Sequence, residues 1–179
     1  MSGSLVGRRL ALLDRDGTII VDKVYLKDPD AIEFAPGAID GLRLLRDAGF
    51  TLVLVTNQSG IARGYFDEAT LRRVHDRLEA RLAAAGLDLA AIYYCPHGPD
   101  QGRACRKPAP GMALEAMRDL GFAPSEAVFI GDADADMGVA AATNVAGLRI
   151  APGRAGAAAD FLEAAQRACA LFCAHETGT

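Results

Sequence analysis

Two carboxylates directly follow an apolar run near the start of the chain. Residues 10–13 read Leu-Ala-Leu-Leu, and Asp14, Asp16, Gly17 and Thr18 come next. Two negative charges this close are unfavourable unless a cation or hydrogen-bond donors compensate them. A bound Mg²⁺ would do so, since it prefers oxygen ligands and binds substrate phosphate. Asp14 would then be placed to attack phosphorus, while Asp16 moves the proton of the leaving oxygen.

Three further polar stretches can contribute to the same chemistry. Residues 56–59 read Thr-Asn-Gln-Ser after a second apolar run, Lys107 stands before a proline, and residues 131–136 read Gly-Asp-Ala-Asp-Ala-Asp. The threonine and Lys107 can hold phosphoryl oxygens, where charge is densest in the transition state. Asp132 can share the metal ion with the nucleophile and a backbone carbonyl.

Each stretch also has a purely structural explanation. Asp-Gly is a common turn dipeptide, and a Thr-Asn-Gln-Ser-Gly loop can hydrogen-bond to its own backbone. Lys107 taken alone would be a solvated side chain, and the acids of residues 131–136 would suit the start of a helix. The functional interpretation therefore depends on all four stretches meeting in space.

Short apolar runs alternate with segments of helical periodicity. The runs carry β-branched or aromatic residues and predict strands buried on both faces, as in a parallel sheet. These predicted strands cover residues 9–14, 51–56, 91–95, 127–131 and 145–150. The predicted helices run from Pro36 to Gly49, from an N-cap at Asp67 to Gly86, from Pro110 to Gly121, and over residues 134–142 and 159–173.

This alternation predicts an α/β fold, a three-layer sandwich with a central parallel sheet and right-handed crossovers. Ligands of such sheets bind outside the carboxyl ends of the strands, which is where the four polar stretches lie. No interval between the strands is long enough for a separately folded lid. We therefore expect a single domain over residues 1–179 with no large cap domain.

The composition narrows the classes of function. Hydrophobic residues make up 51% of the chain, charged residues 23%, and the net charge is -4, which predicts no basic surface for nucleic acid. No apolar run approaches the roughly 18 residues of a membrane span. Four cysteines without a secretion signal indicate reduced thiols. We expect a cytoplasmic monomer that binds neither nucleic acid nor membrane, with His75 at the surface or its boundary.

Taken in order, the four motifs resemble those of the haloacid dehalogenase (HAD) superfamily of phosphotransferases. Asp-Arg-Asp-Gly-Thr is similar to its nucleophile motif, Val-Thr-Asn-Gln-Ser-Gly to its second motif, Arg-Lys-Pro to its lysine motif, and Gly-Asp-Ala-Asp-Ala-Asp to its acidic metal motif. The resemblance implies that Asp14 is the nucleophile and Asp16 the acid/base. It further implies that Thr56 and Lys107 stabilise the phosphoryl group. Asp14, Asp132 and the main chain of Asp16 would then hold Mg²⁺.

Longer stretches resemble a narrower group within the superfamily. The stretches "VTNQSGIARGYF", "IYYCPH" and "CRKPAPGM" are similar to those of the D-glycero-D-manno-heptose 1,7-bisphosphate 7-phosphatases, which share a subfamily with histidinol-phosphatases. Members of that group have no large cap domain and act on a small phosphorylated molecule. The resemblance implies substrate contacts from Asp22, Tyr25, Asn57, Gln58, Ser59 and Arg106.

The chain departs from this group at its zinc site. The group usually carries four ligands, a Cys-x-His pair followed by Cys-x-Cys directly before Arg-Lys. Cys95, His97 and Cys105 stand in place, but Arg103 replaces the remaining cysteine. Structural zinc is almost always four-coordinate, so this departure predicts a weakened site that Asp100 or water would have to complete. The alternative is a loop held without metal, by packing and hydrogen bonds.

Four hypotheses for function follow. The first is a Mg²⁺-dependent phosphomonoesterase that removes the 7-phosphate of the heptose bisphosphate through an aspartyl-phosphate intermediate. The second is a histidinol-phosphate phosphatase, kept open because Ala133 stands where close relatives often carry lysine. The third is a non-catalytic sugar-phosphate-binding relative, which the departures at Arg103 and Ala133 motivate and the intact motifs disfavour. A nucleic-acid end phosphatase is disfavoured by the acidic net charge.

Overall fold

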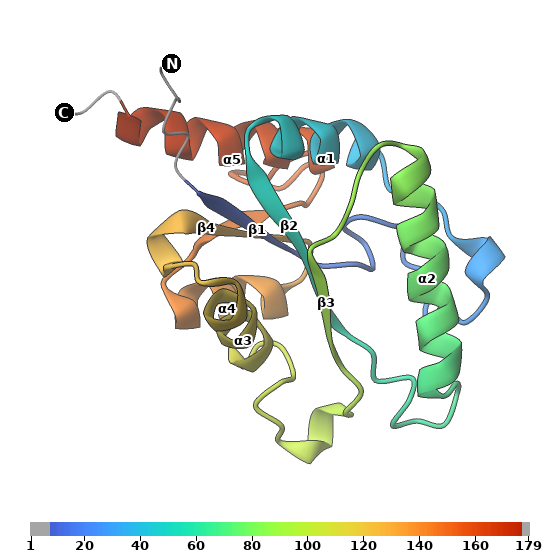
Figure 1. The fold of residues 1–179 in the computed structure, drawn as a ribbon. Coiled ribbons are helices and arrows are strands. Elements are labelled where there is room, and N and C mark those ends of the chain that lie inside the picture. The colour runs from blue at the N-terminus through green and yellow to red at the C-terminus, as the bar shows by residue number, and fades with distance from the viewer. Residues whose placement is uncertain (1–7, 177–179) are drawn as a thin grey trace.

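The computed structural model describes residues 8–176. Within them, five parallel strands form one sheet in the order β3-β2-β1-β4-β5 (Figure 1). The strands are β1 Arg9–Leu13, β2 Phe50–Asn57, β3 Ala91–Cys95, β4 Ala127–Gly131 and β5 Ala146–Arg149. Every strand lies within one residue of its predicted bounds, so the predicted parallel sheet is confirmed.

The helices also occur where the periodicity predicts them. They are α1 Ala38–Asp47, α2 Glu68–Ala84, α3 Gly111–Leu120, α4 Asp134–Thr143 and α5 Phe161–Glu176. Asp67 caps α2, because its side chain accepts a hydrogen bond from the Thr70 N–H at 2.8 Å. Helix α1 begins later than predicted, since Gly37 is the N-cap in the left-handed conformation and Pro36 precedes it. Within the described residues, short 3₁₀ helices that the periodicity does not predict lie at Pro29–Ala31, Pro99–Gln101 and Pro124–Glu126.

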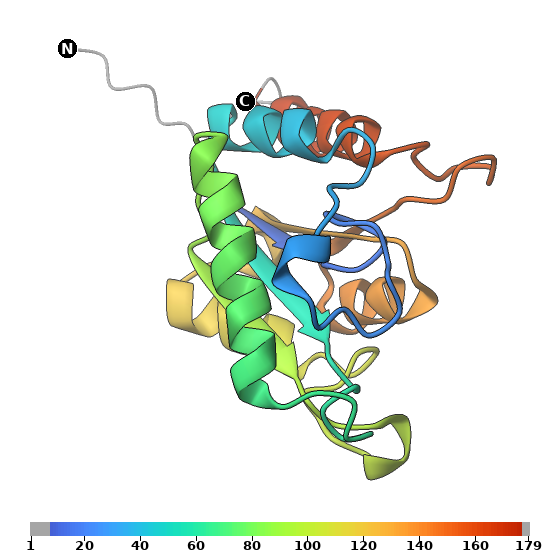
Figure 2. The same cartoon turned by 90° about the vertical axis from the view of Figure 1, so that its right-hand side faces the viewer.

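Alternate side chains of β1 enter two separate cores. Ala11 and Leu13 pack with residues of α1, α2 and α5, whereas Leu10 and Leu12 pack with residues of α3 and α4. Figures 1 and 2 show α1 and α5 along one side of the sheet and α3 and α4 on the other. The predicted three-layer sandwich is confirmed. The central strand β1 is buried by a helix layer on each face and by β2 and β4 at its edges.

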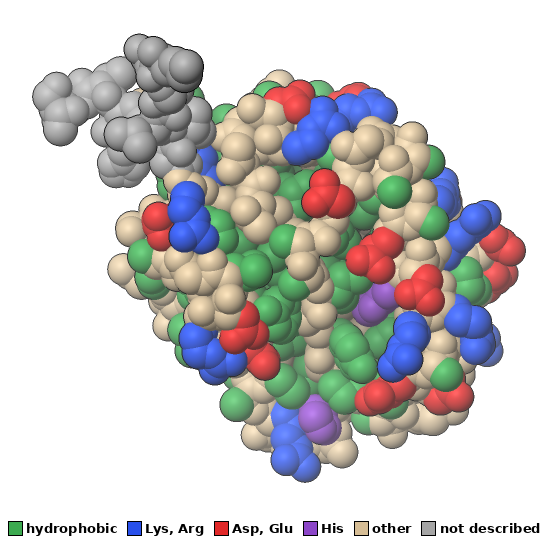
Figure 3. Space-filling view, viewed as in Figure 1, with side chains coloured by type: hydrophobic (Ala, Val, Ile, Leu, Met, Phe, Trp, Pro, Cys, Tyr) green, Lys and Arg blue, Asp and Glu red, His purple; other side chains and the backbone are tan. Residues whose placement is uncertain are grey.

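The surface carries charges of both signs. Acidic and basic side chains lie side by side over the face shown in Figure 3. None of the helices within residues 8–176 combines the length and the apolar character that crossing a membrane requires.

Candidate active site

The end of β1 positions the first aspartates. The Asp14 N–H donates to the carbonyl oxygen of Ile130 at 3.0 Å, which holds Asp14 at the carboxyl edge of the sheet. Asp14 is buried and Asp16 is half-buried. Gly17 follows with a φ of 80°, and a Cβ at this position would collide with the carboxylate of Asp132. Glycine therefore allows the first and fourth motifs to approach each other.

Lys107 connects three elements of the site. Its Nζ donates to Asp14 Oδ1 at 2.6 Å, to Asp136 Oδ1 at 2.6 Å and to the carbonyl oxygen of Val55 at 2.9 Å. An ammonium group has three protons, so all of its donors are used. Lys107 is 5% exposed, and Asp136, in the first turn of α4, is fully buried. Two carboxylates thus compensate one buried cation.

The electrostatics of this cluster favour an added positive charge. Burial raises the pKa of Asp14 to about 7; Lys107 opposes that rise, while Asp136 and Asp16 add to it. Burial also raises the pKa of Asp132, and Asp136 contributes to that shift. Burial lowers the pKa of Lys107, but its carboxylate partners outweigh this effect and the net shift is upward. Lys107 alone therefore leaves an excess of negative charge in the cluster.

The acidic side chains fit a magnesium site. Carboxylate oxygens of Asp14, Asp132 and Asp136 lie within 4.8 Å of one another. Thr18 Oγ1 donates to Asp132 Oδ1 at 3.3 Å and so orients one of them. Carboxylate oxygens are the ligands that Mg²⁺ prefers, and a divalent cation would neutralise their excess charge. The carboxylate of Asp16 faces other partners, which leaves its main chain as the part expected to reach the metal.

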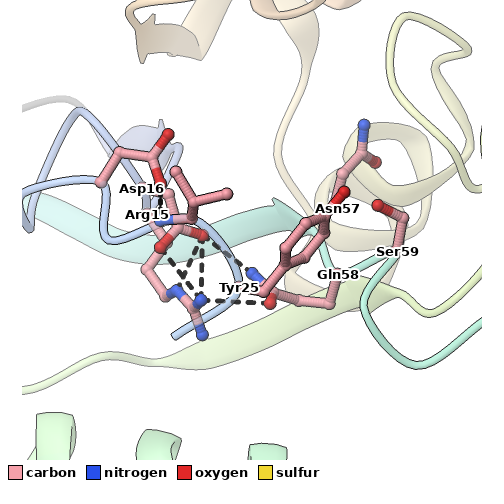
Figure 4. Close-up of a pocket in the computed structure, with 8 residues that line it drawn as sticks. Arg15, Asp16, Tyr25, Asn57, Gln58 and Ser59 are labelled. Carbon is pink, nitrogen blue, oxygen red and sulfur yellow. Dashed lines mark hydrogen bonds and ion pairs between the residues drawn. The ribbon is translucent and has the colours of Figure 1, made fainter. Parts of the chain in front are cut away.

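A pocket of about 260 Å³ opens beside Asp16. Figure 4 shows the Arg15 guanidinium, the Asp16 carboxylate and the Gln58 amide joined at its wall. Arg15 donates from Nε to Asp16 Oδ2 at 3.1 Å and from Nη2 to Oδ1 at 3.0 Å, and Gln58 Nε2 donates to Oδ2 at 2.9 Å. The pocket brings together five of the residues predicted to bind substrate, Asp22, Tyr25, Asn57, Gln58 and Ser59.

The second motif joins the pocket to Lys107. Asn57 Nδ2 donates to the Lys107 carbonyl oxygen at 3.1 Å, and the Lys107 N–H donates to Asn57 Oδ1 at 3.0 Å. Both polar atoms of the Asn57 side chain are therefore engaged in holding the lysine segment. The hydroxyl of Thr56 is buried and accepts a hydrogen bond from Gln58 Nε2 at 2.8 Å. Its own proton can still be donated to another oxygen.

Arg106 lies in a different cavity from the other residues predicted to bind substrate. This second cavity, of about 630 Å³, is lined by Arg106 together with Lys107 and Arg103. Arg106 Nη1 donates to the carbonyl oxygen of His97 at 3.0 Å, which fixes its guanidinium beside the loop of the predicted zinc site. The second cavity is therefore the more basic of the two.

Three donors of the predicted zinc site converge. Cys95 Sγ lies 2.7 Å from Cys105 Sγ and 3.5 Å from His97 Nδ1, and His97 Nδ1 lies 3.3 Å from Cys105 Sγ. Burial raises the pKa of the Cys95 thiol to about 11, and its hydrogen bond with Cys105 adds to the shift. Arg103 and Asp100 are both exposed and do not belong to this group. The described residues thus supply one donor fewer than structural zinc requires.

The prediction that His75 lies at the surface or its boundary is wrong. His75 is 7% exposed, and its Nε2 lies 3.1 Å from Nη1 of Arg15. The helical spacing carried the signal, since His75 follows Leu71 by four residues and precedes Leu78 by three, and both leucines are buried. Arg15 itself, between two aspartates in sequence, has no sequence feature that marks it as buried. The sequence likewise does not distinguish Asp136, which is buried and pairs with Lys107, from the exposed Asp134 of the same motif.

Three comparisons place the chain among known proteins. A family model described as haloacid dehalogenase-like hydrolase matches residues 10–144, which include all four motifs. The D-glycero-beta-D-manno-heptose-1,7-bisphosphate 7-phosphatase of Yersinia pestis is 45% identical over 140 residues, which cover 74% of this chain and 74% of that protein. The enzyme of the same name from Escherichia coli (strain K12) is 47% identical over 141 residues, which cover 74% of this chain and 73% of that protein. The crystal structure of the D,D-heptose 1,7-bisphosphate phosphatase from B. bronchiseptica, complexed with magnesium and phosphate, has a TM-score of 0.81 and 36% identity, covering 89% of this chain and 97% of that one. The chain therefore belongs to the haloacid dehalogenase-like hydrolases.

Proposed function

We propose that this chain is a Mg²⁺-dependent phosphatase that removes the 7-phosphate of D-glycero-D-manno-heptose 1,7-bisphosphate. The observation that carries the proposal is the buried cluster in which Lys107 pairs with Asp14 and Asp136 beside Asp132. Similarity to the Yersinia pestis, Escherichia coli and B. bronchiseptica phosphatases supports the choice of substrate.

The reaction would proceed through an aspartyl-phosphate. Asp14 attacks phosphorus, the bond between phosphorus and the sugar oxygen breaks, and Asp16 gives a proton to that leaving oxygen. Water then attacks the phosphorus of the intermediate and gives a proton to Asp16, which returns Asp14 to its free state. Thr56 and Lys107 would donate hydrogen bonds to the phosphoryl oxygens. Lys107 must exchange one of its three present partners to do so.

Asp14, Asp132 and the main chain of Asp16 would hold Mg²⁺, with Asp136 alongside. When bound, the ion supplies the positive charge that lets a phosphate approach the anionic nucleophile. Other side chains of the protein orient these ligands. Thr18 orients the Asp132 carboxylate, and Lys107 holds the carboxylates of Asp14 and Asp136 together.

The pocket beside Asp16 would bind the sugar. Asp16 must reach the leaving oxygen, so the group that departs has to lie on the side of the site where Asp16 faces the pocket. Asp22, Tyr25 and Ser59 line that pocket and carry hydroxyl or carboxylate groups suited to sugar hydroxyls. In the neighbouring cavity, Arg106 would offer a cation to the substrate's remaining phosphate.

Steady-state kinetics on a panel of phosphate esters tests this proposal. The panel contains both anomers of the heptose 1,7-bisphosphate, histidinol phosphate and fructose 1,6-bisphosphate, each with Mg²⁺ and with a chelator. We expect kcat/KM for a heptose bisphosphate to exceed the others by on the order of 10²-fold, and turnover to require Mg²⁺. A preference for histidinol phosphate would assign the sibling activity instead. Saturable binding of the heptose bisphosphate without phosphate release would indicate a non-catalytic protein.

Four properties stay predictions from the sequence. They are the single domain over residues 1–179, the monomeric state, the cytoplasmic location and the absence of nucleic-acid or membrane partners. Residues 1–7 and 177–179 of that domain lie outside the described part of the chain. Sedimentation of the purified protein measures the oligomeric state directly.

A further inference from the structure

Arg15 is a buried side chain at the wall of the pocket. Its side chain is 1% exposed, although it stands between Asp14 and Asp16 in sequence. Besides its two bonds to the Asp16 carboxylate, it donates from Nη2 to Gln58 Oε1 at 3.1 Å. Its remaining terminal nitrogen, Nη1, lies 3.1 Å from His75 Nε2. Every nitrogen of this guanidinium therefore has a partner in the protein.

The contact with Arg15 fixes the chemical form of His75. A guanidinium has only donors, so His75 Nε2 has to be the acceptor and carries no proton. Burial and, to a smaller extent, the charge of Arg15 together lower the pKa of His75 to about 4, while Asp16 opposes both. The imidazole is thus neutral, with its proton on Nδ1. From β3, Tyr94 packs edge-on against the ring, with the centroids 6.1 Å apart.

His75 contacts the proposed acid/base only indirectly, through Arg15. The residues that line the pocket include Arg15 and Asp16 but not His75. Helix α2 anchors one side of the guanidinium through His75, and the opposite side holds the Asp16 carboxylate by two parallel hydrogen bonds. Without an acceptor at position 75, Nη1 would be buried and unpaired, and the guanidinium would turn to find a partner. The Asp16 carboxylate would turn with it.

We propose that His75 is a positioning residue for proton transfer, acting through Arg15 to aim the Asp16 carboxylate at the leaving oxygen. The proposal rests on the proposed role of Asp16 as the acid/base. It differs from a purely structural role in one respect. Loss of a positioning residue slows the reaction more for a substrate whose leaving group needs a proton. Loss of stability slows the reaction of every substrate to the same extent.

The test compares two substrates in single turnover. The heptose bisphosphate has an alcohol leaving group that needs protonation, whereas p-nitrophenyl phosphate has a stable anionic leaving group. His75→Phe keeps an aromatic ring but removes the acceptor, and we expect its rate of leaving-group release to fall by roughly 10-fold to 100-fold for the heptose bisphosphate. With p-nitrophenyl phosphate the rate should stay within about twofold of wild type. His75→Gln places an amide oxygen near the position of Nε2 and should restore most of the lost rate.

Three results would overturn the proposal: equal losses on both substrates, no loss on the heptose bisphosphate, or a Gln variant no better than the Phe variant. If His75→Phe does not fold, His75→Leu, which also lacks an acceptor, is measured in its place. Asp16→Asn is the reference variant. Leaving-group selectivity in Asp16→Asn but not at position 75 rejects the role of His75 and leaves the phosphatase standing. Equal losses on both substrates in Asp16→Asn reject the acid/base assignment and the positioning role together.

Discussion

Lys107 Nζ lies 2.6 Å from Asp14 Oδ1, although 93 residues separate them in sequence. Lys107 Nζ lies at the same distance from Oδ1 of Asp136, in the first turn of α4. The proposed nucleophile and the acidic fourth motif therefore share one buried cation. This charge holds three motifs in place before any substrate binds.

The pKa of Asp14 predicts a pH-dependent stability of the metal-free protein. Burial raises that pKa from 3.8 to about 7, so between these values the folded state binds a proton that the unfolded state has released. The contribution of protonated Asp14 is complete below about pH 4 and is lost as the pH rises through about 7. Asp14→Asn stays neutral throughout, so in chelator its Tm should match wild type near pH 4 and exceed it near pH 8. Parallel Tm curves for the two proteins would contradict the raised pKa.

The buried ion pair predicts that substitution of Asp136 lowers the stability of the folded protein strongly, whereas substitution of Asp134 lowers it little. Measured at pH 5, where Asp14 is protonated because its pKa is raised to about 7, Asp136→Asn removes the remaining carboxylate partner of the buried Lys107, a change that typically destabilises a protein by about 3 kcal/mol. For a domain of this size, that corresponds to a fall in Tm of roughly 6–12 °C. Asp134→Asn is the matched control, because Asp134 begins the same helix but is exposed and pairs with Arg149 at the surface. Similar Tm values for the two variants would rule out a stabilising role for the buried pair.

The close approach of Gly17 to Asp132 predicts that a side chain at position 17 weakens Mg²⁺ binding. Gly17→Ala places a Cβ against the Asp132 carboxylate and strains a backbone with a φ of 80°. Gly64→Ala is the matched control, since Gly64 has a φ of 72° but open space around its Cα. We expect both variants to lose stability, but only Gly17→Ala to bind Mg²⁺ more weakly, by about 10-fold. Calorimetric titration with Mg²⁺ measures this, and equal affinities in the two variants would contradict the clash with Asp132.

The three-donor cluster predicts that one substitution restores a strong zinc site. Arg103→Cys supplies the fourth ligand beside Cys95, His97 and Cys105 and removes a positive charge. After dialysis against a mild chelator, we expect this variant to keep about one zinc ion per chain and the wild type to keep much less. Arg103→Ala separates the effect of the charge from that of the added ligand. Mass spectrometry of the metal content decides, and a wild type that retains as much zinc as the cysteine variant would show that three donors suffice.

The sheet was predictable because strands buried on both faces appear in sequence as short continuous apolar runs. The meeting of Asp14 with Lys107 and Asp132 was predictable for a related reason, since the carboxyl ends of neighbouring parallel strands share one edge. The contact between His75 and Arg15 was not predictable from the sequence. Helical spacing can place His75 on the buried face of α2, but its partner depends on how α2 packs against the end of β1. The assignment of Arg106 to a separate cavity likewise depends on loop packing.

The nucleophile can be identified by chemical trapping. Enzyme quenched during turnover of the heptose bisphosphate is treated with borohydride, which reduces an aspartyl-phosphate to homoserine, and its tryptic peptides are analysed by mass spectrometry. We expect homoserine at position 14, in the peptide of residues 10–15, and none when substrate is omitted. Homoserine at another aspartate, or an Asp14 that stays unreduced while a burst of phosphate is released, would contradict the proposed reaction.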